Sequence, residues 1–173
     1  MGKAERHQPV KLITGFIFKE EPILKQAKII LKNKFGVIDY ESPVLEFTHT
    51  DYYEKEFGAY LKRAFVSFKK LIPPESISRI KIITNRIEEK LSHQGRRMVN
   101  IDPGYLDLSK LVLATTKDYS HRIYLSEGIY AEVTLYYRDK GFKPFAWTYP
   151  DYKTAEYATI FNQIRQIYYE QIR

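Results

Sequence analysis

Apolar residues in the first half of the chain recur at two spacings, one typical of strands and one typical of helices. Short β-branched and aromatic runs predict strands, and apolar residues at steps of three and four predict helices. The expected strands are 9–18, 37–50 with a break at Ser42-Pro43, and 61–72; the expected helices are 20–36 and 75–95. The short stretch 51–58 predicts a turn or a single helical turn that ends at Gly58.

The second half of the chain alternates shorter elements with turns. The expected elements are a strand at 97–102 ending in an Asp102-Pro103-Gly104 turn, a short helix or strand at 107–117, a β-hairpin at 121–141, an aromatic loop at 142–152 and a closing helix at 154–173. The whole pattern predicts a single α+β domain over 1–173. Its sheet should be largely antiparallel or mixed, with about three helices packed on it and residues 1–9 as a flexible lead-in.

The hairpin turn at Ser126-Glu127-Gly128 sets an expected register. One face would be apolar, with the pairs Leu125–Ile129, Ile123–Ala131 and His121–Val133. The other face would be polar, with the pairs Tyr124–Tyr130 and Arg122–Glu132, extended by Thr134 and Tyr136. That polar face is either a solvated sheet surface with a cross-strand ion pair or the floor of a polar pocket.

Composition excludes several classes of function. The chain of 173 residues has no Cys, which excludes disulfides, thiolate metal sites and thiol nucleophiles, and fits a reducing cytoplasm. No apolar run approaches the ~18 residues of a membrane span, and the N-terminus lacks the apolar core of a secretory signal. Asn and Gln are scarce beside Lys, Glu, Ile and Tyr, a composition that leans toward a thermophilic source.

The net charge of +7 is concentrated in one segment. Residues 57–97 hold ten Lys/Arg and three Asp/Glu, whereas 1–56 and 98–173 each hold nine of either sign. A localised basic surface attracts anions, and nucleic-acid-binding proteins place Lys and Arg on one face. The alternative is an ordinary solvated surface. The candidate nucleic-acid contacts are Lys62, Arg63, Lys69, Lys70, Arg79, Arg86, Arg96 and Arg97.

Two His/Asp neighbours are the candidates for acid–base or metal chemistry: Asp118 with His121, and His49 with Asp51. A carboxylate can orient an imidazole, so Asp118 would orient His121 as acid or base. Such neighbours also occur by chance, and Asp118 could simply cap a turn. No metal site is predicted and no cofactor is identified. The phosphate-binding loop, the dinucleotide fingerprint and the nucleophile-elbow motif are all absent.

The aromatic loop PFAWTYPDY at 144–152 contains the only Trp of the chain, Trp147. Pro144 and Pro150 stiffen it. The loop is either a lid that seals the sheet before the last helix or a stacking wall for a planar ligand.

Several segments together resemble one protein family. They are DYYEKEFG at 51–58, FVSFKKL at 65–71, TNRIEEK at 84–90, VNIDPGYLDLSKLVLATTKDYSHRIYL at 99–125, GIYAEVTL at 128–135 and WTYPDY at 147–152. From about 12 to 168 the chain is similar to an uncharacterised prokaryotic family, a domain of unknown function marked by DYY and VN-[IL]-DPGYL motifs. The resemblance implies no established activity and gives no residue a catalytic role.

Three functions stay open. The first is a binding domain for an anionic partner, nucleic acid or nucleotide-like, that uses the basic segment 57–97. The second is an enzyme acting on a phosphorylated small molecule with a polar site around 100–134. The third is an assembly protein with a Tyr-rich oligomer interface. The candidate ligand-binding residues are Asn85, Arg86, Asn100, Asp102, Tyr105, Lys117, Arg122, Tyr124 and Trp147, and the candidate catalytic residues are His121, Asp118 and Glu132.

Overall fold

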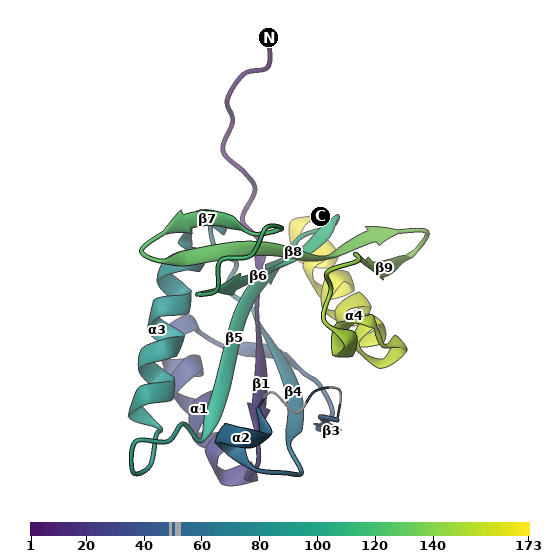
Figure 1. The fold of residues 1–173 in the computed structure, drawn as a ribbon. Coiled ribbons are helices and arrows are strands. Elements are labelled where there is room, and N and C mark those ends of the chain that lie inside the picture. The colour runs from purple at the N-terminus through teal and green to yellow at the C-terminus, as the bar shows by residue number, and fades with distance from the viewer. Residues whose placement is uncertain (49, 51–52) are drawn as a thin grey trace.

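The computed structural model describes residues 1–48, 50 and 53–173 (Figure 1). Two sequence features fall partly or wholly outside this range: the His49/Asp51 pair, and the first two residues of the DYY motif, Asp51 and Tyr52.

One antiparallel sheet of nine strands organises the described residues, in the order β2-β4-β1-β5-β6-β8-β7 with β3 beside β4 and β9 beside β8. The strands are β1 (Lys11–Phe18), β2 (Ile38–Glu41), β3 (Leu45–Glu46), β4 (Lys62–Phe68), β5 (Val99–Leu106), β6 (Lys110–Thr115), β7 (Ile123–Ser126), β8 (Ile129–Arg138) and β9 (Gly141–Pro144). The helices are α1 (Glu21–Phe35), the single turn α2 (Glu54–Phe57), α3 (Ile77–Lys90) and α4 (Ala155–Ile172), with 3-10 turns η1 (Pro74–Ser76) and η2 (Pro150–Lys153). The predicted α+β class is confirmed.

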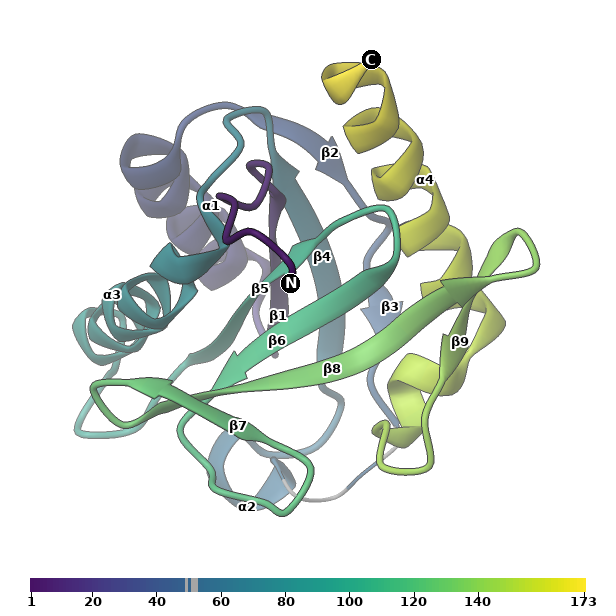
Figure 2. The same cartoon turned by 90° about the horizontal axis from the view of Figure 1, so that it is seen from above.

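Strand β1 lies in the middle of the sheet and is buried along its whole length. Leu12 and Phe16 point to the face that α1 and α3 cover, and Ile13 points to the face that α4 covers. A strand buried on both faces has no polar side, which is why its sequence is an almost continuous apolar run. Strands β6, β7, β8 and β9 cross over one end of the upright β1, β4 and β5 (Figures 1 and 2).

The predicted turn at Asp102-Pro103-Gly104 is wrong, because β5 runs straight through these residues to Leu106. Proline in a strand is tolerated where its missing N–H would not be used in the ladder. The N–H of Ile101 points away from β1 and donates to the Glu88 side chain. Because directions alternate along a strand, an N–H at position 103, two residues further on, would also point away from β1. The N–H that Pro103 lacks is therefore one that β1 does not use. Strand β6 pairs with β5 only from Gly104 onward, so no ladder bond is lost.

Gly104 marks the point where β6 begins to cross β5. A Cβ atom at this position would lie 2.4 Å from the carbonyl oxygen of Val112 and 2.8 Å from the Leu113 side chain. Only a glycine allows the two backbones to approach this closely. Gly104, which the sequence pattern placed in a turn, therefore lies inside the sheet, where it allows β5 and β6 to approach closely.

The hairpin of β7 and β8 pairs largely as predicted, but burial does not follow its two expected faces. Ile123 pairs with Ala131 and Tyr124 with Tyr130, while the tight turn places Ser126, and not Leu125, opposite Ile129. Ile123 on the apolar face is 69% exposed, whereas the polar residues Glu132 and Thr134 are buried. The Arg122–Glu132 part of the polar face is therefore buried and does not form a solvated surface, which leaves the alternative of a polar pocket there.

The remaining elements follow the sequence pattern closely. The stretch at 37–50 forms two short strands on either side of Ser42-Pro43, and the ambiguous stretch at 107–117 contains strand β6. Residues 1–9 are exposed and have no regular secondary structure (Figure 1). Within the described part of the chain, no helix has the length and apolar character that spanning a membrane requires.

Candidate functional site

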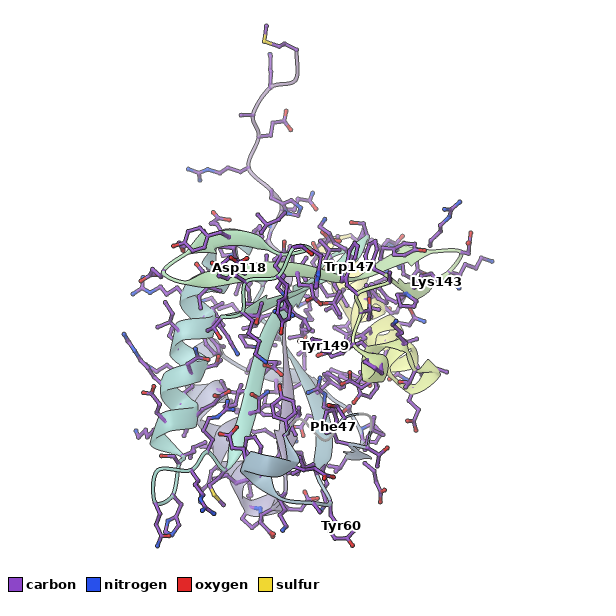
Figure 3. The ribbon with its side chains drawn as sticks, viewed as in Figure 1. Phe47, Tyr60, Asp118, Lys143, Trp147 and Tyr149 are labelled. Atoms are coloured by element: carbon purple, nitrogen blue, oxygen red, sulfur yellow. The ribbon has the colours of Figure 1, made fainter. Side chains whose placement is uncertain are left out.

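A cavity of about 610 Å³ lies on the same face of the sheet as α4, over the part of that face that α4 does not cover. Its floor is formed by β1, β4 and β5, and its sides by α3 and by the turn at 149–152. Strands β6 and β8, which cross over the upright strands, form its roof. The sharp crossing of the sheet therefore creates the cavity. In Figure 3, Tyr149 lies below β8 on the same side as Phe47, and both residues line the cavity.

Arg63 is the most unusual residue of this cavity, because it carries a charge on the floor with only 2% of its surface exposed. Its Nη2 donates to the Tyr152 hydroxyl at 2.8 Å and lies 3.4 Å from Asp151. Its Nη1 lies 3.8 Å from Asp102. Among the described residues, neither Nη1 nor Nε makes a hydrogen bond of good geometry, although the Tyr157 hydroxyl lies close to the guanidinium. The guanidinium is therefore only partly satisfied by the protein.

Aromatic rings surround the Arg63 guanidinium. Its Cζ lies 4.9 Å from the ring centre of Phe65, 5.2 Å from that of Tyr152, 5.6 Å from that of Phe47 and 5.8 Å from that of Tyr157. Ring faces attract cations, and this attraction partly replaces the lost water. Such a cage holds the guanidinium in one place while leaving its in-plane donors unused.

The charge of Arg63 is maintained in spite of burial. Burial alone would lower the pKa of the guanidinium, but the neighbouring Tyr152, Asp151 and Tyr157 outweigh it and raise the pKa. Burial in turn raises the pKa of Tyr152 well above its ordinary value, so that phenol stays neutral. Arg63 is therefore a permanent buried cation, and its acidic neighbours are Asp151 and Asp102.

Lys81 and Asp102 lie beside Arg63 on the floor. Lys81, from α3, donates to the backbone carbonyl of Ile101 at 3.2 Å and lies 3.4 Å from the Asp102 carboxylate. Asn100 donates to the other Asp102 oxygen at 2.6 Å. Asp102 keeps 25% of its side chain exposed, so its carboxylate faces the cavity between two cations.

Arg97 closes one end of the cavity and has its donors occupied by the protein. It binds both oxygens of Glu56 at 2.6 Å, Glu88 at 2.9 Å and Asn100 at 3.2 Å. Hydrogen bonding to Glu56 is the main reason why the pKa of Arg97 is raised, against the effect of burial. With these partners Arg97 acts as a structural clamp between α2, α3 and β5.

Arg122 and Glu132 form a buried ion pair at the roof. Arg122 donates to Glu132 at 2.8 Å, to the carbonyl of Lys117 at 3.0 Å and to the Tyr149 hydroxyl at 3.1 Å. Glu132 also lies 3.1 Å from the His121 ring nitrogen and accepts from Thr134 at 3.1 Å. All three guanidinium nitrogens of Arg122 are thus in use, which makes it a positioning residue.

The structure gives His121 a different carboxylate partner from the predicted one. Asp118 is exposed and lies beside Tyr130, where burial and this carboxylate raise the pKa of the phenol. His121 contacts Glu132 instead and stacks on Trp147 with ring centres 5.4 Å apart. Trp147 stacks on Phe145 and donates to the backbone of Val133. This stack lies next to the cavity without lining it, which favours the sealing role of the aromatic loop.

The other candidate residues divide into two groups. Those that line the cavity are Asn85, Asn100, Asp102, Lys117, Arg122 and Glu132. Arg86 points to solvent from α3, Tyr105 packs against the core beneath α1 and α3, and Tyr124 is exposed on β7. The structure therefore brings together five of the nine predicted ligand-binding residues and the candidate catalytic residue Glu132.

The basic segment does not form one surface. Lys62 begins β4 at the end of the sheet near Arg96, whereas Lys69, Lys70 and Arg79 lie at the other end. The seven residues of β4 separate these ends by roughly 20 Å. Arg63 is buried on the cavity floor and is not part of an exposed basic surface. Lys62 is paired with Glu21 at 3.1 Å.

Sequence reasoning missed several cavity residues on which the site depends, among them Lys81, Glu88, Tyr119, Tyr149 and Asp151. Lys81 and Glu88 could have been recognised from the sequence, because they recur with the predicted residue Asn85 at steps of four and three beside the isoleucine stripe of α3. Among the described residues, no group of three or more acidic or histidine side chains is placed to hold a metal ion.

Comparison with known proteins identifies the family of the chain and no individual similar protein. No curated protein and no solved structure matches the chain. The family model described as a domain of unknown function (DUF4416) matches residues 8–168, nearly the whole chain. The protein therefore belongs to the DUF4416 family.

Proposed function

We propose that the protein binds a small molecule carrying a carboxylate or phosphate group in the cavity beneath β6 and β8. The observation that carries this proposal is Arg63, a fully buried cation on the cavity floor with two nitrogens that make no hydrogen bond of good geometry. Buried charges in proteins are almost always paired and hydrogen-bonded, because an unmet donor keeps its full desolvation cost. An anionic group bound in the cavity would lie close to this charge and balance it.

Lys81 provides a second cation for the same group. Its two contacts, at 3.2 and 3.4 Å, are longer than a good charge-assisted hydrogen bond, so its ammonium can turn toward a ligand. Asn85, one helical turn from Lys81 on the same wall, adds a neutral amide. The cavity volume of about 610 Å³ lies within the range of small-molecule sites. A small molecule fits this site better than a nucleic-acid chain.

Asp102 limits which anions the cavity can bind. Its carboxylate lies next to Lys81 and within 3.8 Å of Arg63, so it competes with any bound anion for the same two cations. It would repel a ligand with several acidic groups more strongly than a ligand with a single acidic group. Removing the Asp102 charge should therefore strengthen binding of the anionic group.

The test is titration calorimetry with inorganic phosphate, ribose 5-phosphate and phenyl phosphate. Lys81→Met, which keeps the length and loses the charge, should weaken binding by about tenfold, the value of a charge-assisted hydrogen bond. Asp102→Asn should strengthen it. Lys90→Met is the matched control, because Lys90 is exposed on the same helix outside the cavity, and it should leave binding unchanged.

Two results would contradict the proposal. One is the absence of heat and of thermal stabilisation with every probe at millimolar concentration. The other is weaker binding by Asp102→Asn, which would show that the ligand presents a cation or a donor to this carboxylate. Arg63 itself is not substituted, because its loss would leave Asp151 without its buried partner.

A further inference from the structure

We infer that the ligand also carries a planar aromatic or heteroaromatic ring, which packs against the exposed rings of Tyr119 and Tyr149 at the mouth of the cavity. This inference rests on the proposed function and specifies the class of ligand. Both tyrosines line the cavity, and they are 49% and 42% exposed. Most other aromatic side chains that line it, such as Phe47 and Tyr152, are buried. The exposed rings therefore mark the side on which the cavity opens.

One buried residue fixes both rings. The Arg122 guanidinium lies over the Tyr119 ring, with its Cζ 4.3 Å from the ring centre. The same guanidinium donates to the Tyr149 hydroxyl at 3.1 Å. Exposed tyrosines usually rotate freely, whereas these two are held by a side chain that Glu132 and the Lys117 carbonyl lock in place. Rings held in this way bind a flat group with little loss of side-chain entropy.

Arg122 has no further part in binding. Its three nitrogens are all occupied by protein groups, and its side chain is 2% exposed. We therefore assign Arg122 to holding the two rings, and the anion to Lys81 and Arg63. Among the described residues the two tyrosine rings do not contact each other, so each presents a face or an edge to whatever enters the mouth.

A single turn connects the mouth to the anion-binding floor. Tyr149 begins this turn, the Tyr152 backbone N–H donates to the Tyr149 carbonyl at 3.0 Å, and the Tyr152 hydroxyl accepts from Arg63. The ring-binding and anion-binding groups thus lie one helical turn apart along the same wall. A compact molecule, with a ring at one end and a single phosphate or carboxylate group at the other, matches both ends.

The test compares probes that differ only by a ring. Adenosine monophosphate is compared with ribose 5-phosphate, and phenyl phosphate with inorganic phosphate, by titration calorimetry on the full chain. Each ring-bearing probe should bind about tenfold or more tightly than its partner, since stacking on an aromatic side chain contributes this much. The Tyr119→Ala/Tyr149→Ala double variant should lose that preference and keep the affinity for ribose 5-phosphate.

Two further variants locate the effect. Tyr149→Phe keeps the ring and should retain most of the preference, and Tyr124→Ala removes an exposed tyrosine on β7 outside the cavity and should retain all of it. Equal affinities within each pair would overturn the inference and leave the anion-binding proposal standing. A preference that survives the double variant would overturn the placement at the mouth. Failure of every probe to bind would overturn the proposed function itself.

Discussion

Glu88 shows how one carboxylate serves two structural elements. One oxygen accepts from the Ile101 N–H of β5 at 2.5 Å, and the other accepts from Arg97 at 2.9 Å. Burial raises the pKa of Glu88, although Lys81, the Ile101 N–H and Arg97 all act to lower it. The folded protein therefore holds the Glu88 proton more tightly than the unfolded chain does. The resulting stabilisation is complete below the unfolded pKa of about 4.3 and is lost as pH rises through the folded value.

The Glu88→Gln variant tests this sign. Glutamine keeps an acceptor for Ile101 and cannot ionise. The free energy of unfolding of the variant, measured relative to that of the unaltered protein, should therefore increase as pH rises from 4 to 7. Urea unfolding at several pH values measures the difference. Glu89→Gln, at the exposed neighbouring position, should leave the pH profile unchanged. A profile for Glu88→Gln parallel to that of the unaltered protein would show that the burial of Glu88 does not control its ionisation.

At the scale of elements, the turn between β5 and β6 depends on Asp107. One carboxylate oxygen accepts from the backbone N–H groups of Ser109 and Lys110 at 2.7 and 2.8 Å, and the other accepts from the Lys110 ammonium at 2.7 Å. Burial would raise the pKa of Asp107, but these hydrogen bonds outweigh it and lower the pKa. The stabilisation is therefore present above the unfolded pKa of about 3.9 and is lost as pH falls through the folded value.

Substitution of Asp107 should weaken the turn in a pH-dependent way. Asp107→Ala should lower the free energy of unfolding by about 1–3 kcal/mol at pH 7, because buried donors lose their acceptor. The loss should begin to shrink below about pH 4, where the Asp107 carboxylate of the unfolded chain takes up a proton, and should shrink further as pH falls through the lower folded value. Asp107→Asn keeps one acceptor and should lose less, with no acid dependence of its own. Thermal and urea unfolding between pH 2 and 7 measure both variants, and a loss that is constant over this range would contradict the role of ionisation.

At the scale of the whole molecule, the local sequence pattern predicts the helices and strands. The position of the cavity is determined instead by the crossing of strands that are distant in the sequence. The apolar run of β1, the isoleucine stripe of α3 and the turn at Ser126-Glu127-Gly128 each determine their own structure, so the sequence predicts them. The burial of Glu132 depends on β8 folding over β5, which no local spacing reveals. The position of Arg63 follows in the same way from contacts with η2, almost ninety residues further along the chain. A basic residue in a strand resembles a surface residue until its distant partners are known.

The open edge of β5 has a consequence for how the molecule moves. The Ile101 amide is held by a side chain of α3 and not by a neighbouring strand, so a change of the Glu88 rotamer releases it while the sheet stays intact. Its exchange with deuterium should therefore be faster than that of Asp102, whose residue pairs with Gly15 of β1. A ligand that engages Lys81 would fix α3 against β5 and slow that exchange. The Ile101 amide proton is thus a built-in reporter of cavity occupancy, readable by NMR without any label on the ligand.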